Sequence, residues 1–412
     1  MGGRLIRNAV ALIASGGGTA ILGVVFWSIA AHRATPANLG RNSAEIAIMI
    51  LIASLSQLGF GSTFERFLPI AGNRTRQFVV RAYVVCFLIA LVLAMGYVSL
   101  GLANRVVPTS FGWRALFIVV TAMWVVFALQ DSVLVGLRES RWVPVENVLY
   151  SLAKLALIPV ALTLSSSQGV FLAWTSPVIV VIVVVNWYLF KKRIPEHQAR
   201  NVSSEALPSR RELTLLTGSQ FATLLLNVIS PAIVTLIVIQ RLGPVASAHY
   251  YLPSQIASGA SILIGSINRS FLVEASSESE ALRDHARVAL RAGLVVLIAS
   301  VVLGGIFAPL ILSLFGTTYA ASGSTLLRLL FLALPGYTIA TFYSSFALLD
   351  KRVWWMVVRD VFSTGVYFGT LFVFIGRFGI LAMGIASLTE AGLLGVFFLP
   401  MLVRRYRATS SS

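Results

Sequence analysis

The sequence holds little of what a soluble protein needs on its surface. Only 11% of its 412 residues are charged, against roughly 25% in a typical soluble protein. A single cysteine, Cys86, excludes an intramolecular disulfide. Its four histidines form no cluster, which argues against a metal site. We therefore expect neither a soluble fold nor a metal centre.

Acidic residues are scarcer still, with 15 Asp and Glu against 32 Lys and Arg and a net charge of +17. In a soluble protein this excess would suggest nucleic acid binding. In a membrane protein, however, Lys and Arg gather in the cytoplasmic loops. We therefore expect no nucleic acid partner.

Long hydrophobic runs are what the sequence does contain. Hydrophobic residues make up 57% of the chain, and its mean hydropathy is +0.87. A run of about 18 residues can cross the membrane as a helix. We predict an all-α polytopic membrane protein with about twelve spans, near residues 8–31, 43–63, 79–103, 114–136, 146–164, 168–190, 213–239, 247–268, 287–314, 324–347, 354–376 and 379–402.

Two details refine these spans. The first run is longer than that of a cleavable signal peptide, so we expect it to remain as a span. The second and eighth are rich in Ser, Gln, Asn and Gly. We expect them to face a protein interior or a cavity.

The basic residues predict an orientation. With the N-terminus inside, 24 Lys and Arg fall in inner segments and 7 in outer ones, while Lys154 lies within a span. Such a bias is typical of cytoplasmic loops. It predicts an even number of spans with both termini in the cytoplasm.

The chain also repeats itself weakly at an offset of about 210 residues. FGSTFERFLP (Phe60–Pro69) is matched by IGSINRSFLV (Ile264–Val273), and GLRESRW (Gly136–Trp142) by LLDKRVW (Leu348–Trp354). These matches predict two pseudo-symmetric six-helix lobes around a central cavity, as in transporters with parallel repeats. We place the lobes at residues 1–190 and 213–403, a cytoplasmic connector at 191–212 and a cytoplasmic tail at 404–412.

Several short motifs resemble those of Wzx-type polysaccharide and O-antigen flippases. The turn TPANLG (Thr35–Gly40) is similar to their LGP-x-x-(F/Y)-G turn, although Asn38-Leu39-Gly40 lacks the aromatic–Gly pair. Gly59-Phe60-Gly61 with Arg66 matches the end of their second span. Leu129–Trp142 and Leu314–Leu330 resemble two later junctions. These flippases belong to the multidrug/oligosaccharidyl-lipid/polysaccharide exporter superfamily.

The resemblance implies a non-enzymatic transporter that flips a polyprenyl-pyrophosphate-linked oligosaccharide or polysaccharide repeat unit across a bacterial inner membrane by alternating access. It implies a lipid-linked glycan and membrane lipids as partners, possible contacts with a polysaccharide polymerase or glycosyltransferases, and a monomeric transport unit. No cofactor is expected beyond proton or sodium coupling.

Three other functions stay open at this stage. The first is a multidrug or small-solute cation-coupled antiporter of the same superfamily. The second is a membrane glycosyltransferase or polymerase, which would need catalytic carboxylates on a sizeable outer loop. The outer loops are short here, with Glu45 the only acid near one. The third is a scaffold that has lost transport.

Charges within the spans are the first candidate site residues, because intramembrane charge is costly and usually functional or paired. Lys154 lies eight residues after Glu146, on roughly the same helix face. It could bind a pyrophosphate or glycan, or pair with a carboxylate of another span. Glu390 lies among small residues and could be a coupling site or a hydrogen-bonded structural carboxyl. Glu146 and Asp131 are further candidates for titratable groups, although Asp131 could instead be a helix-end carboxylate beside Arg138 or Arg141.

Residues at the predicted span ends complete the set. Arg66 and Arg269 occupy equivalent inner ends, where they could receive a pyrophosphate or only anchor their spans. Arg33 and Arg41 run against the charge bias on the outer side and are candidates for an exit mouth. Asn227, Ser230 and Pro231 could break span 7 and supply polar groups to the cavity, or Pro231 could only kink the helix.

Overall fold

The computed structural model describes residues 19–200, 230–277, 282–350 and 353–408. Every described element is helical, and the predicted α-helical membrane fold is confirmed. Nine of the described helices are long and apolar enough to cross a membrane. The shorter apolar helices Thr19–Arg33 and Ser230–Arg241 and the helix α10 (Pro244–Ser277) fall at the other three predicted spans.

The chain divides into two compact units, Met1–Ser247 and Ala248–Ser412. The predicted lobe boundary at the 191–212 connector remains a prediction, since residues 201–229 lie outside the described part. Residues 191–200 of the predicted connector are helical. They make a π-helical turn (η3, Leu189–Arg193) and α8 (Ile194–Arg200).

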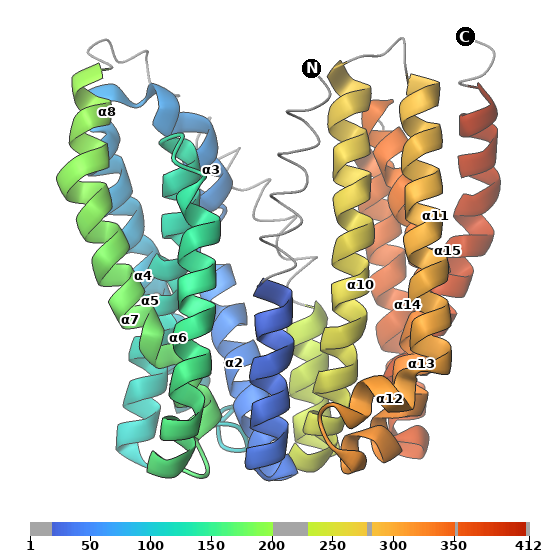
Figure 1. Ribbon diagram of the computed structural model, residues 1–412, viewed down its shortest axis with the longest axis horizontal. Helices are drawn as coiled ribbons and strands as arrows, with labels where there is room; N and C mark the ends of the chain where they lie inside the picture. Colours follow the sequence, from blue (N-terminus) through green and yellow to red (C-terminus); the bar gives the residue numbers. More distant parts are fainter. Residues whose placement is uncertain (1–18, 201–229, 278–281, 351–352, 409–412) are drawn as a thin grey trace. The chain divides into compact units, whose positions relative to one another are not determined.

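Unit 1 begins, in the described part, with the helix Thr19–Arg33. A set of long helices and short turns comes after it in the chain. These are α2 (Pro36–Ser56), α3 (Phe60–Phe67), the 3-10 turns η1 (Leu68–Ile70) and η2 (Gly72–Arg74), α4 (Thr75–Ser99), α5 (Phe111–Gly136), α6 (Trp142–Leu164) and α7 (Gly169–Tyr188). Figure 1 shows α4 to α7 as an up-and-down bundle, and α5 packs against both α4 and α7.

Local chemistry sets where α2 begins and ends. The Thr35 side chain accepts the backbone N–H of Asn38 at 3.3 Å, and Pro36 occupies the first helical turn. Gly59 has a φ of 81°, a left-handed conformation that separates α3 from the end of α2. The most apolar window of α2 is 67% buried, which confirms the prediction that this span faces a protein interior.

Unit 2 contains most of α10 and five further helices. These are α11 (Leu282–Ile306), the short α12 (Ala308–Ser313), α13 (Thr317–Leu349), α14 (Val353–Phe378) and α15 (Leu381–Ala408). Its core includes the fully buried Phe271, Phe342 and Phe346. The most apolar windows of α11 and α14 are only 17% and 11% buried, so most of their apolar surface is not covered by other helices of this unit.

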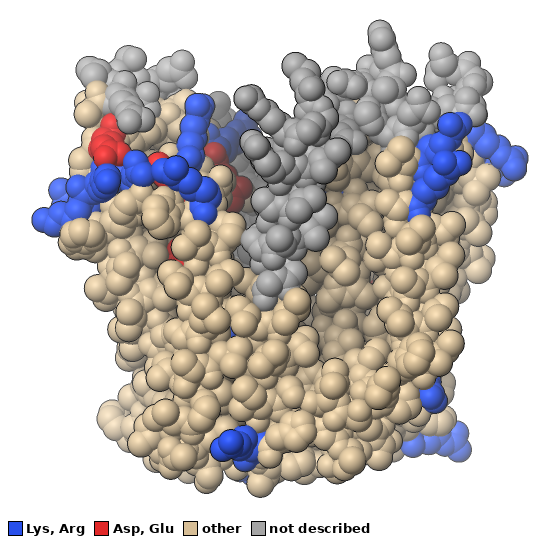
Figure 2. All heavy atoms as spheres, in the orientation of Figure 1, with Lys and Arg blue, Asp and Glu red and all other residues tan. Residues whose placement is uncertain are grey.

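On the face shown in Figure 2, most charged side chains lie near the two ends of the helices and few lie between them. In unit 1, Lys and Arg gather at the end that carries α8, with Asp and Glu among them. At this end, Arg193 forms ion pairs with Glu139 at 3.2 Å and with Glu196 at 2.8 Å. These pairs connect η3 with α8 and with the turn before α6. The apolar middle and charged ends fit a multi-pass membrane protein.

Candidate functional site

Lys154 is buried within unit 1 among aromatic rings. Its side chain comes from α6 and the residue is 5% exposed. The Nζ atom lies 3.8 Å from the ring centre of Trp174 on α7, 4.9 Å from that of Tyr150 and 5.4 Å from that of Phe26. The three rings therefore surround the ammonium group through cation–π contacts.

Within the described residues, Lys154 has neither an ion pair nor a hydrogen bond. Glu146 shares its helix but lies eight residues away, about 12 Å along the axis. A cation–π contact contributes about 0.5–2 kcal/mol, whereas an ammonium group loses several kcal/mol of hydration on burial. The three N–H donors of Lys154 are thus available to an anionic group, and the predicted interhelical ion pair is not seen in the described chain.

Glu146 and Asp131, two of the predicted titratable residues, take part in neighbouring polar contacts between α5 and α6. Gln130 donates a hydrogen bond to Glu146 Oε1, and Asn186 on α7 donates to Gln130 at 2.9 Å. Asn147 donates to Asp131 at 3.4 Å. These contacts tie α5, α6 and α7 together. One oxygen of each carboxyl, Glu146 Oε2 and Asp131 Oδ1, is buried without a partner in the described chain.

Glu45 is a buried carboxyl that the sequence did not single out as a site. It lies on α2, is 1% exposed, and neither oxygen has a hydrogen-bond partner among the described residues. The hydroxyl of Tyr97 on α4 is also buried and has no hydrogen-bond partner among the described residues. Buried polar groups are nearly always hydrogen-bonded, so Glu45 and Tyr97 are functional candidates.

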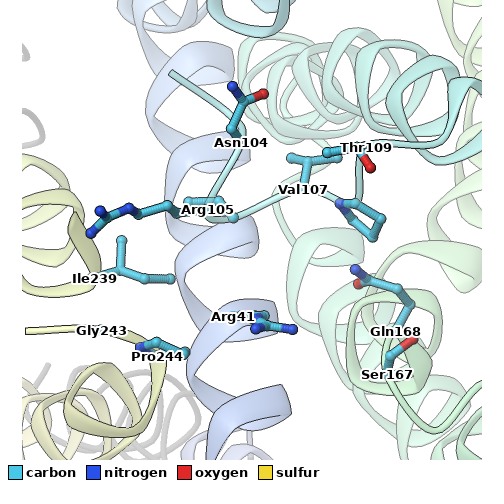
Figure 3. Close-up of a pocket in the computed structure, with 12 residues that line it drawn as sticks. Arg41, Asn104, Arg105, Val107, Thr109, Ser167, Gln168, Ile239, Gly243 and Pro244 are labelled. Carbon is cyan, nitrogen blue, oxygen red and sulfur yellow. The ribbon is translucent and has the colours of Figure 1, made fainter. Parts of the chain in front are cut away.

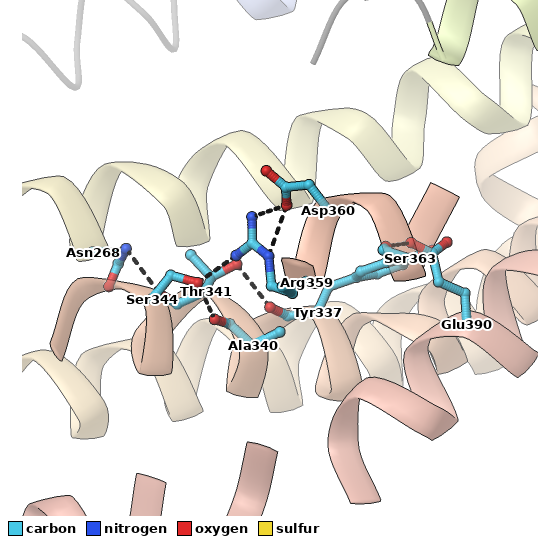
Figure 4. Close-up of polar contacts among 9 residues, drawn as sticks. All are labelled: Asn268, Tyr337, Ala340, Thr341, Ser344, Arg359, Asp360, Ser363 and Glu390. Carbon is cyan, nitrogen blue, oxygen red and sulfur yellow. Dashed lines mark hydrogen bonds and ion pairs between the residues drawn. The ribbon is translucent and has the colours of Figure 1, made fainter. Parts of the chain in front are cut away.

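Glu390 lies in a polar network of unit 2 (Figure 4). The Tyr337 hydroxyl of α13 donates to Glu390 Oε2 at 2.5 Å, and Ser363 of α14 hydrogen-bonds Glu390 Oε1. On α14, Arg359 pairs with Asp360 and donates to Ser344. Glu390 is 8% exposed. The structure therefore shows a hydrogen-bonded carboxyl shared by three helices, while its coupling role stays a prediction.

A close helix crossing holds Glu390 in this position. A Cβ on Gly336 of α13 would overlap the backbone carbonyl of Ala391, and a Cβ on Gly384 would lie 2.7 Å from Leu329 Cβ. Small residues let helix backbones approach in membranes. Because Gly336 precedes Tyr337 and Ala391 follows Glu390, this contact brings the tyrosine and the carboxylate together.

The predicted span-end arginines are exposed. Arg66 on α3 lies 5.4 Å from the ring centre of Phe67. Arg269 on α10 donates to Ser266 at 3.3 Å. Arg33 ends the helix Thr19–Arg33. Asn227 lies outside the described residues. Lys154, Glu146 and Asp131 thus belong to the interior of unit 1, and Glu390 belongs to that of unit 2.

The described residues contain no group of three or more His, Cys, Asp or Glu side chains that could hold a metal ion.

A family model described as "Polysaccharide biosynthesis protein" matches residues 5–279. No curated protein sequence matches the chain.

Several solved structures resemble the chain at low identity. The lipid II flippase MurJ in an inward closed conformation is 15% identical, covers 97% of this chain and 90% of its own, and gives a TM-score of 0.69. An outward-facing multidrug resistance MATE family transporter of the MOP superfamily is 15% identical over 99% and 96%, with a TM-score of 0.59. A mutant of the Vibrio cholerae MATE transporter VcmN is 14% identical over 98% and 96%, with a TM-score of 0.60. These likenesses show a shared fold.

Proposed function

The chain belongs to the polysaccharide biosynthesis protein family, and from this we propose that it flips a lipid-linked oligosaccharide from the cytoplasmic to the outer leaflet. The substrate would be a polyprenyl pyrophosphate carrying a polysaccharide repeat unit. Such a molecule has an anionic head, a polar glycan and an apolar tail. Its head cannot cross hydrocarbon unaided, because each unsatisfied polar group costs several kcal/mol there.

The observation that carries the proposal is the uncompensated charge of Lys154. A buried cation without a carboxylate partner in the described chain favours an anionic substrate over a cationic drug. The oxygens of a pyrophosphate can accept hydrogen bonds from the N–H groups of Lys154, as phosphates do from other lysines. The rings of Phe26, Tyr150 and Trp174 fix where the ammonium group sits.

Other predicted residues take roles within the same proposal. Arg66 and Arg269 would receive the pyrophosphate at the inner side, and Arg33 would contact it at the outer side. Glu390 would couple transport to a proton or sodium gradient, with Asp131 and Glu146 as further titratable groups. Transport would proceed by alternating access in a bacterial inner membrane, with both termini in the cytoplasm. A polysaccharide polymerase or glycosyltransferases would be the protein partners.

A cation-coupled multidrug antiporter is the second candidate. A drug extruder would place acidic residues within its N-terminal spans, and unit 1 does bury Glu45 and Glu146 there. Buried carboxylates attract organic cations as Lys154 attracts anions. The two candidates therefore differ in which buried charge meets the substrate, the cation of Lys154 for a flippase or the carboxylates of Glu45 and Glu146 for a drug antiporter.

Depletion in the native host tests the proposal. We expect polyprenyl-linked glycan to accumulate and to stay inaccessible to glycan-modifying reagents added outside the cells. Complementation with the wild-type chain should reverse this, and Lys154→Met should not. Unchanged glycan levels together with new sensitivity to cationic dyes would instead support the drug antiporter.

A further inference from the structure

A second candidate binding site lies within unit 1, in a cavity with a volume of about 530 Å³ (Figure 3). Four segments line it: α2 through Arg41, the α4–α5 loop through Arg105, the turn before α7 through Gln168, and the turn before α10 through Gly243. The charge bias of the sequence assigns all four segments to the outer side. The volume is in the usual range for small-molecule sites.

The charge of this lining is entirely positive. Arg41 and Arg105 line the cavity and no acidic residue does. Arg41 is exposed and has no hydrogen bond or ion pair with any described residue. Arg105 donates to the backbone carbonyl of Gln240 and extends toward the segment that carries Ile239. Two arginines here oppose the general bias of basic residues toward the inner side.

Helix N-termini add to the positive potential. The helix α7 begins immediately after Gln168, and α10 begins at Pro244, which also lines the cavity. The helix dipole makes both ends favourable for an anion. At α7 the N–H of Phe171 already donates to Asn42 Oδ1 at 2.9 Å, and Pro244 at the start of α10 has no N–H.

Gln168 supplies an independent sign of a ligand. It is 2% exposed, and its Oε1 atom is buried without a hydrogen-bond partner in the described chain. A buried acceptor of this kind usually has a donor. A hydroxyl group of a bound molecule would satisfy it.

We infer that this cavity binds an anionic, hydroxyl-bearing group such as a sugar phosphate. The side chains of Arg41 and Arg105 donate hydrogen bonds to the phosphate, which lies near the N-terminus of α7. The Oε1 atom of Gln168 accepts a hydrogen bond from a hydroxyl group. Binding itself does not depend on transport. The further statement that the cavity receives the head of the flipped glycan rests on the proposed function.

Two sources share this chemistry, the exported glycan and the head group of phosphatidylglycerol. The full chain in phosphatidylcholine nanodiscs is titrated with glucose 1-phosphate, and with glucose as the neutral control. In parallel, its unfolding temperature is measured in nanodiscs with and without phosphatidylglycerol. Each measurement is repeated for Arg41→Gln, Arg41→Lys, and Arg377→Gln as the matched outer-side control from unit 2.

We expect glucose 1-phosphate to bind and Arg41→Gln to weaken binding by about tenfold or more, since charge-assisted hydrogen bonds are the stronger ones. Arg41→Lys keeps the charge and should bind within a few-fold of the wild type, and Arg377→Gln should match it. Stabilisation by phosphatidylglycerol alone that is lost in Arg41→Gln would assign the site to the phospholipid.

The inference is overturned if neither probe acts through Arg41, or if glucose binds as well as glucose 1-phosphate. Glycan accumulation after depletion is measured separately. A failed binding experiment would therefore leave the flippase proposal standing, and a failed depletion experiment would leave the binding site standing.

Discussion

Lys154 is buried among aromatic rings, and its effect on stability can be measured apart from its proposed role in transport. Its burial without an anionic partner costs hydration that the rings of Trp174, Tyr150 and Phe26 only partly replace. Methionine has a similar length and no charge, and it packs well against aromatic rings.

We therefore expect Lys154→Met to raise the unfolding temperature in detergent while transport of lipid-linked glycan falls by about tenfold or more, the loss of one charge-assisted contact. Tryptophan fluorescence follows unfolding, and a proteoliposome assay follows transport. Lys154→Arg keeps the charge and should retain more activity. Normal transport with lowered stability would show that Lys154 is only structural.

Glu390 offers a second test at the residue scale. Glutamine preserves the shape of the side chain and can still accept the hydrogen bond from Tyr337. We expect Glu390→Gln to fold normally but to transport at a rate that no longer responds to a proton or sodium gradient. Glu390→Ala should lower the free energy of unfolding by about 1–3 kcal/mol, because it leaves the Tyr337 hydroxyl without its acceptor. An unchanged gradient dependence in the glutamine variant would remove Glu390 from coupling.

The sequence could predict some of these side chains and not others. An isolated Lys within an apolar run identifies Lys154 directly from the sequence. Its ring partners Phe26 and Trp174 cannot be predicted, because they are far from it along the chain. Hydropathy starts the apolar run at residue 43 and so puts Glu45 near an outer loop. The helix in fact begins at Pro36, which puts Glu45 well inside it.

At the scale of helices, the contact between α13 and α15 keeps Tyr337 and Glu390 within hydrogen-bond distance. Gly336 leaves no room for a Cβ beside Ala391. A Cβ added to Gly395 would lie 3.6 Å from the Cα of Gly336. Separation of these two helices would also separate Tyr337 from Glu390.

We expect Gly336→Ala to lower the free energy of unfolding by about 1–3 kcal/mol, the usual cost of overpacking, and to weaken the response to a gradient that is expected to be lost in Glu390→Gln. Gly369→Ala is the matched control, since a Cβ at Gly369 on α14 would meet nothing within 4 Å. Urea or thermal unfolding in detergent compares the two variants. Equal stability of both would mean that α13 and α15 can separate without cost.

Helix number was predictable because apolar runs are long, but helix ends and breaks were not. Capping by Thr35 starts α2 at Pro36, before the predicted start at residue 43, and the left-handed Gly59 separates α2 from α3 inside that predicted span. Similarly, α12 is a separate short helix where a single span to residue 314 was expected. Hydropathy responds to transfer into lipid, whereas these breaks depend on local backbone hydrogen bonding.

For the whole molecule, the distribution of 24 inner and 7 outer basic residues predicts which ends of the helices face the cytoplasm. Unit 1 offers a test, since Lys192 and Ser110 are both exposed and lie at opposite predicted sides. The single Cys86 is buried on α4 and can be replaced by serine to give a cysteine-free background.

In that background, we expect a membrane-impermeant maleimide to label Ser110→Cys in intact cells and Lys192→Cys only after permeabilisation. The reason is that moving the basic 191–200 segment outward would oppose the positive-inside preference. The same orientation would put the cavity lined by Arg41 and Arg105 on the outer side and the Arg66 end of α3 on the inner side. The reverse labelling pattern would invert the direction in which each candidate site meets its ligand, and the exit role of the Arg41 cavity would have to be abandoned.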